Sequence, residues 1–179
     1  MFDFENAPIP IRSNLANAFR HVWDRLARAG TWWSGAERVA IAAVGRAAYE
    51  GQPIPQDPLV PPPAQETAAL LGKRPAAVTE ELIATWESQG LDADRYVELI
   101  GIVAQVTAVD TFHRAMSLDL EPLPEPQPGE PSRETPTSPA RKTKAWVPMV
   151  GPPTIPTSLS AVPAEMDALE ALHGPAYLS

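Results

Sequence analysis

The chain has 179 residues, of which 44% are hydrophobic, and its formal net charge is −8. Because an acidic protein is repelled by phosphate backbones, this charge argues against nucleic acid as a partner. The sequence contains no cysteine, which excludes disulfides, thiolate nucleophiles and cysteine-ligated zinc. Half of the 22 prolines fall within residues 122–156, so we expect one globular region and one stiff, extended region.

Neither a targeting signal nor a membrane span is predicted. The N-terminal residues 1–5 lack the basic and apolar regions of a signal peptide. The longest apolar stretch, residues 97–109, is too short to cross a bilayer and contains Glu98 and Gln105. We therefore expect a soluble, cytoplasmic protein that does not contact a membrane.

Two helices are predicted before residue 50. Apolar residues recur at helical spacing near the N-terminus: Leu15, Phe19, Val22 and Leu26. This pattern indicates an amphipathic helix that begins near residue 13 and ends by Gly30. Ser34 and Glu37 then have the spacing of a capping box, which predicts a second helix running to about Tyr49. Its many alanines would let another helix approach closely.

The proline-rich segment 51–63 is expected to be irregular, because proline removes backbone donors and favours extended geometry before it. A short helix is predicted at about residues 66–71. Another helix is predicted to begin at Pro75 and to end at Gly90.

The longest predicted element spans residue 93 to about residue 116, with Asp92 as its N-cap. Its many β-branched residues would also be compatible with two strands. A helix is favoured because the run is long, lacks a turn signal and alternates poorly. Apolar residues on most of its sides predict a central, buried helix.

Residues 121–158 are expected to form an extended linker or wrapping arm, because they are polar and rich in proline. Within them, the apolar segment Trp146–Val150 is expected to dock on a surface of the protein. A last helix is predicted at residues 164–173, ended by Gly174 and Pro175.

Three strings carry a resemblance to a known family: GTWWSGAERVAIAAVGRAA at 30–48, GLDADRYVELIGIVAQVTAVDTFHRAM at 90–116, and EPLPEPQPGEPSRE at 121–134 followed by AWVPMV. In order and spacing they resemble the AhpD-like alkylhydroperoxidase and carboxymuconolactone decarboxylase superfamily, in its peroxidase-related branch. The resemblance implies an all-α bundle of packed antiparallel helix pairs with a proline-rich C-terminal arm. The implied division is a helical domain at 1–120, the arm at 121–158, and at 159–179 a short helix that could begin a second, missing repeat.

The resemblance also implies a redox site, and this chain departs from it. Redox-active members carry a Glu early on one helix and a CxxC pair at the start of the next, with a His one turn beyond. Glu37 matches the early Glu, but Tyr49 and Gln52 stand where the thiols are expected. We therefore expect a non-catalytic structural or oligomerisation half of a peroxidase-related protein. Its expected partner is another copy or a second AhpD-like repeat or subunit, which could also supply the missing CxxC.

The alternative is a thiol-free, decarboxylase-type enzyme that acts on a small organic acid. Glu98 would be its first candidate group, because a buried, unpaired carboxyl has a raised pKa and can act as a general acid or base. If an arginine pairs with Glu98, its role is structural; Arg38, Arg46 and Arg95 are the candidate partners. Glu37 is also a candidate proton relay, although its position favours helix capping.

Asp110 and His113 are the remaining candidate catalytic groups. Their spacing of three residues on a helix would let the carboxylate orient the imidazole, as in a catalytic pair or half a metal site. Because no third ligand is evident, neither a metal nor a cofactor is expected, and a structural pair at the helix end is favoured. The decarboxylase interpretation requires Glu98 and His113 to share one pocket.

Tryptophans cluster in the first half of the chain, at positions 23, 32, 33 and 86. They could line an apolar ligand pocket. Core or subunit-interface anchors are the more common role for such residues.

Overall fold

The computed structural model describes residues 2–154 and 157–176, and within them it contains helices and no strand. The elements are α1 (Ser13–Ala27), α2 (Gly35–Glu50), α3 (Pro62–Lys73), the 3-10 helix η1 (Pro75–Ala77), α4 (Glu80–Ser88), α5 (Ala93–Ala115) and α6 (Pro163–Ala176). The predicted all-α class is confirmed, and the β-branched run after Asp92 forms one continuous helix. In this part of the chain no helix is long and apolar enough to cross a membrane.

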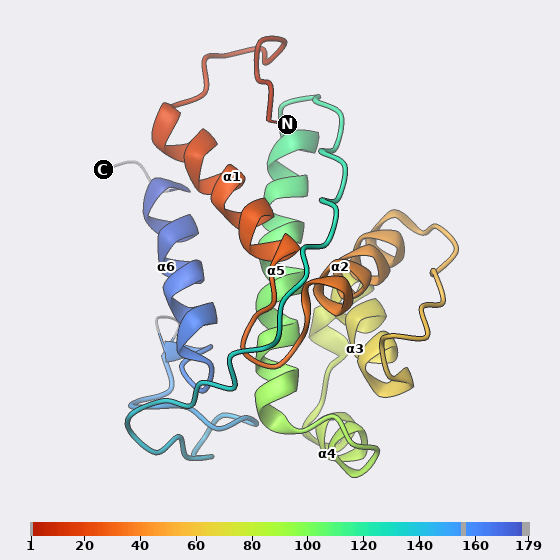
Figure 1. Ribbon diagram of the computed structural model, residues 1–179, viewed down its shortest axis with the longest axis vertical. Helices are drawn as coiled ribbons and strands as arrows, with labels where there is room; N and C mark the ends of the chain where they lie inside the picture. The colour runs from red at the N-terminus through yellow and green to blue at the C-terminus, as the bar shows by residue number, and fades with distance from the viewer. Residues whose placement is uncertain (1, 155–156, 177–179) are drawn as a thin grey trace.

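α5 is the central helix of the fold. α1 and α6 lie on one side of it, α2 and α3 lie on the other, and α4 lies near its N-terminal end (Figure 1). Its core residues are almost completely buried: Val97, Leu99, Ile102, Val106 and Val109. The prediction of a buried central helix is therefore confirmed, as is its N-cap, because the Asp92 side chain accepts a hydrogen bond from the Arg95 backbone N–H.

The predicted capping box starts α2. The Ser34 backbone N–H donates to Glu37 Oε2 at 2.7 Å, and the Glu37 backbone N–H donates to Ser34 Oγ at 3.3 Å. The helix ends at Gly51, whose φ of 68° lies in the left-handed region that glycine adopts without strain.

α2 and α3 pack closely because glycines face each other. A Cβ atom on Gly72 would overlap the carbonyl oxygen of Gly45. With a larger residue at position 72, α2 and α3 could not pack this closely. α3 is longer than the predicted 66–71 segment and begins at Pro62. The expectation of irregular structure through residue 63 was wrong there, because the first turn of a helix does not need the N–H that proline lacks.

α6 packs on α1 and α5, with Ala168 and Leu172 buried. The predicted end at Gly174–Pro175 was wrong, because the helix continues to Ala176 with Pro175 inside its last turn. One proline at a frayed helix end removes a single N–H, which costs less there than in a helix interior.

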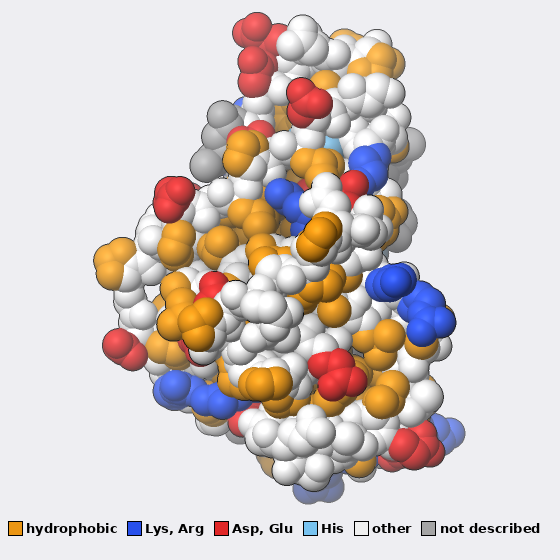
Figure 2. Space-filling model, turned by 90° about the vertical axis from the view of Figure 1, so that its right-hand side faces the viewer, with side chains coloured by type: hydrophobic (Ala, Val, Ile, Leu, Met, Phe, Trp, Pro, Cys, Tyr) orange, Lys and Arg blue, Asp and Glu red, His pale blue; other side chains and the backbone are white. Residues whose placement is uncertain are grey.

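The irregular segment after α5 runs along the α1–α2 connection. The backbone N–H groups of Gln127 and Ser132 donate to the carbonyls of Ala27 and Gly30, at 2.7 and 3.0 Å. The Trp23 indole N–H donates to the Pro122 carbonyl at 2.7 Å. These bonds hold the segment against the bundle. Hydrophobic side chains occur across the side of the molecule seen in Figure 2, interrupted by scattered charged groups.

Candidate functional site

A cluster of buried charges lies where α2, α5 and α6 meet. Arg38 of α2 donates through the same nitrogen, Nη1, to Glu98 of α5 and to Glu165 of α6, the latter at 2.9 Å. Arg38 is 2% exposed, and both carboxylates are fully buried. Three helices that are distant in sequence are therefore joined through one guanidinium group.

Neighbouring groups complete the hydrogen bonding of the two carboxylates. The Trp32 backbone N–H donates to Glu98 Oε2 at 2.6 Å. Glu165 accepts from Gln105 Nε2 at 2.9 Å and from Arg25 Nη2 at 3.1 Å. All four carboxylate oxygens thus have donors, which offsets much of the cost of burying them.

The pKa values in this cluster reflect burial and charge in competition. Burial raises the pKa of Glu98 above its ordinary value, repulsion from Glu165 adds to the rise, and attraction to Arg38 opposes it. For Arg38, burial lowers the pKa, but the two carboxylates outweigh burial and raise it. The guanidinium is therefore permanently charged, while Glu98 is the member of the cluster that is easier to protonate than an exposed glutamate.

Two glycines lie against the charge cluster, and their lack of a side chain makes room for it. A Cβ on Gly30 would overlap the Glu98 carboxylate and the Arg38 guanidinium, and a Cβ on Gly101 would lie 2.6 Å from Glu165 Oε2. Glycine at both positions is explained by this close approach of charged groups to the backbone.

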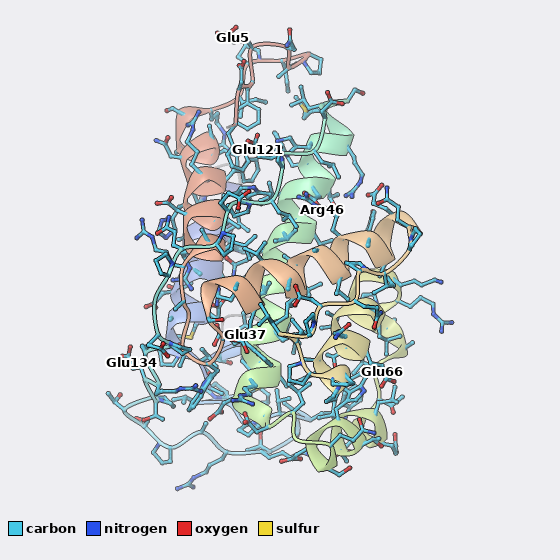
Figure 3. The ribbon with its side chains drawn as sticks, turned by 45° about the vertical axis from the view of Figure 1, so that its right-hand side comes forward. Glu5, Glu37, Arg46, Glu66, Glu121 and Glu134 are labelled. Atoms are coloured by element: carbon cyan, nitrogen blue, oxygen red, sulfur yellow. The ribbon has the colours of Figure 1, made fainter. Side chains whose placement is uncertain are left out.

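A second ion pair joins α2 to the C-terminal half of α5. Arg46 binds Asp110 through two parallel hydrogen bonds, of 2.8 Å from Nε and 2.7 Å from Nη2. Its Nη1 also donates to the Glu121 carbonyl at 3.1 Å. Figure 3 shows Arg46 reaching toward α5 just below Glu121. Both carboxylate oxygens of Asp110 therefore accept hydrogen bonds from Arg46.

His113 is bound locally and among aromatic rings. Its Nδ1 lies 2.8 Å from the Val109 carbonyl oxygen, one helical turn earlier. Its ring centroid lies 5.7 Å from those of Phe2 and Phe4. The spacing of Asp110 and His113 suggests a pair, but in the fold each side chain binds a different partner.

The decarboxylase interpretation requires Glu98 and His113 to share one pocket, and the structure places them far apart. Glu98 and His113 are 15 residues apart on α5, which is about 22 Å along a straight helix. His113 lines a polar hollow of about 370 Å³ near the N-terminal segment, whereas Glu98 is enclosed by Arg38 and the Trp32 backbone. Glu37 caps α2, which is the role its spacing favours.

Sequence reasoning missed Glu165 as a member of the cluster. A signal was present, because Glu165 shares the helical face of three apolar residues: Ala168, Leu169 and Leu172. An acid on the apolar face of an amphipathic helix indicates a buried partner.

Of the four tryptophans in the first half of the chain, Trp23, Trp33 and Trp86 are core residues at 0–1% exposure. In the described residues, no three acidic or histidine side chains converge to hold a metal ion.

Comparisons with protein-family models, with curated proteins and with solved structures give no match to this chain.

Proposed function

We propose that the chain is a non-catalytic, AhpD-like helical module that acts through structural or oligomer contacts, as one half of a peroxidase-related protein. One observation supports this proposal above the others: the carboxylates that could do acid–base chemistry are already bound. Glu37 is bound within a helix cap, Glu98 to Arg38, and Asp110 to Arg46. Since the chain has no cysteine, it also lacks a thiol nucleophile.

The local structure at positions 49 to 52 agrees with a non-redox role. Thiolates are stabilised at the N-terminal end of a helix, where the helix dipole is positive. Tyr49 lies instead in the last turn of α2, and Gln52 follows the left-handed Gly51. Thiols introduced at these two positions would gain no such stabilisation.

An apolar groove on α5 supports the association part of the proposal. It measures about 390 Å³ and is lined by Leu71, Pro75, Ile100, Val103, Ala104, Thr107 and Ala108. Ala104 and Ala108 are exposed on α5 at a spacing of one turn. Small residues in such a groove would let a helix of a second copy approach closely.

The proposal is tested first by activity. The purified chain should not reduce cumene hydroperoxide with dihydrolipoamide or dithiothreitol as donor, relative to a heat-denatured sample. Turnover above that background would refute the non-catalytic assignment.

The association proposal is tested by sedimentation velocity at increasing protein concentration. The native chain should form a defined oligomer, and Ala104→Glu should shift it to the monomer, because a charge buried at an interface is unfavourable. Ala171→Glu places the same charge at an exposed site on α6 and serves as the matched control. A monomeric native chain, or an equal response of both variants, would argue against the groove as the interface.

The decarboxylase alternative gains no support from a specific observation, because the Glu98 and His113 side chains do not share a pocket.

A further inference from the structure

A separate pocket of about 610 Å³ lies between the helical bundle and the irregular segment before α6. Its floor comes from α4 and α5, through Ile83, Tyr96 and Ile100. Its wall comes from residues within 145–154 and from residues 158 and 159, and includes Trp146 and Met149. Pockets of this size, between about 300 and 1,000 Å³, are typical of small-molecule sites.

The wall of the pocket is held in place by hydrogen bonds. Arg141 and Met149 exchange two backbone hydrogen bonds, of 2.9 and 3.1 Å. Ser160 Oγ accepts from the Val150 backbone N–H at 2.8 Å. Because these bonds fix both sides of the Trp146 turn, the cavity is a built feature of the fold.

The lining determines which ligand chemistry fits. The described lining residues carry no charged side chain, so a charged ligand would lose its hydration without gaining a partner. Trp146 is 47% exposed and lies at the pocket. A half-exposed indole offers a flat apolar surface on which a ring or chain can pack.

Tyr96 is the residue of the pocket floor that carries a hydroxyl group. The residue is 4% exposed and its ring packs near Trp86, at 6.0 Å between centroids. None of the hydrogen bonds found among the described residues involves its hydroxyl, although that oxygen is not sealed from solvent. Burial raises the pKa of Tyr96 to about 12, so the hydroxyl stays protonated and can donate at neutral pH.

We propose that this pocket binds an uncharged, largely apolar small molecule with one hydrogen-bond acceptor, such as a carbonyl oxygen, placed to accept from the Tyr96 hydroxyl. The site adds to the proposed function, because a module that acts only through structural contacts needs no such cavity. It involves neither the buried charge cluster nor Ala104, and Ile100 is the residue that lines both this pocket and the Ala104 groove.

The test compares two neutral ligands of nearly equal size, 2-acetylnaphthalene and 2-ethylnaphthalene, which differ in a carbonyl acceptor. Each is titrated against bound N-phenyl-1-naphthylamine, a neutral probe that fluoresces in apolar sites. The native chain should bind the ketone more tightly. Tyr96→Phe should lower the affinity for the ketone about five- to tenfold, the equivalent of one hydrogen bond, and leave the affinity for the hydrocarbon unchanged. Circular dichroism confirms that the variant remains folded.

Matched controls come from surface residues outside the pocket. Tyr49→Phe, the control for Tyr96→Phe, should change the affinity for neither ligand. Trp146→Ala, inside the pocket, should lower the affinity for both ligands. Its control, Leu59→Ala, should lower neither affinity. The proposal would be overturned if the native chain bound neither ligand, if both bound equally, or if Tyr96→Phe had no effect. None of these outcomes depends on peroxidase activity or on the Ala104 association test.

Discussion

Two arginines of α2 bind carboxylates of α5, and they do so in different ways. Arg38 is enclosed and uses one nitrogen for two glutamates on different helices, while its Nε has no partner among the described residues. Arg46 keeps 16% of its side chain exposed and makes a two-bond pair with a single aspartate. Arg38 thus makes two hydrogen bonds to two buried carboxylates, whereas Arg46 makes two to a single carboxylate.

The difference indicates that the two sites serve the fold differently. Arg46 binds Asp110 through two parallel hydrogen bonds, and Arg114 lies 4.0 Å from the same carboxylate, so this acid has more than one cation near it. At Arg38, two buried acids share one guanidinium, and Glu165, which belongs to α6, is also paired with Arg25 of α1 at 3.1 Å. The docking of α6 is therefore linked to the charge balance in the centre of the bundle.

Replacing Arg38 should have the largest effect. Arg38→Met would leave Glu98 and Glu165 buried without their shared counter-charge, and should lower the free energy of unfolding by about 3–5 kcal/mol. Urea denaturation followed by circular dichroism measures the loss. Arg28→Met is the control, because Arg28 is exposed and, among the described residues, its one ion pair is with Asp24, so it should change stability by less than about 1 kcal/mol. Equal effects of the two substitutions would contradict the importance of the cluster.

Replacing Arg46 should have a smaller effect. Arg46→Met removes two charge-assisted hydrogen bonds from Asp110, which should cost about 2 kcal/mol. Arg114, at 4.0 Å from Asp110, leaves the carboxylate partly compensated. Adding Asp110→Leu should recover part of the loss, because replacing both members of a buried pair avoids a lone charge. The comparison of the two arginines fails if Arg46→Met is more damaging than Arg38→Met in the same assay.

Much of this architecture was predictable from local signals, and the rest was not. Asp92 and Ser34 mark the starts of two helices, because capping depends on residues three positions apart. Arg38 was one of three arginines proposed to pair with Glu98. The apolar face of α6 indicates that Glu165 has a buried partner, but it does not say which one, because the partner Gln105 lies 60 residues away in the sequence. Likewise, the partners of Asp110 and His113 depend on the packing of α2 and the N-terminal segment, which overrides their spacing on α5.

The smallest expected effect is a pH dependence that tests the electrostatics of the Arg38 cluster. The pKa of folded Glu98 is raised above its ordinary value of 4.5, first by burial and then by Glu165, despite Arg38. Between the unfolded and folded values the folded chain binds more protons, so this group's contribution to stability falls as pH rises.

Glu98→Gln should therefore gain stability relative to the native chain as pH is raised from about 4.5 to 7, with a slope no greater than about 1.4 kcal/mol per pH unit for one group. Urea denaturation across that range measures the difference, and Glu66→Gln on the exposed face of α3 corrects for the loss of one negative charge. The opposite slope would mean that Arg38, rather than burial, dominates at Glu98. The contrast between the two arginines would then reduce to a difference in burial and in the number of acids that each one binds.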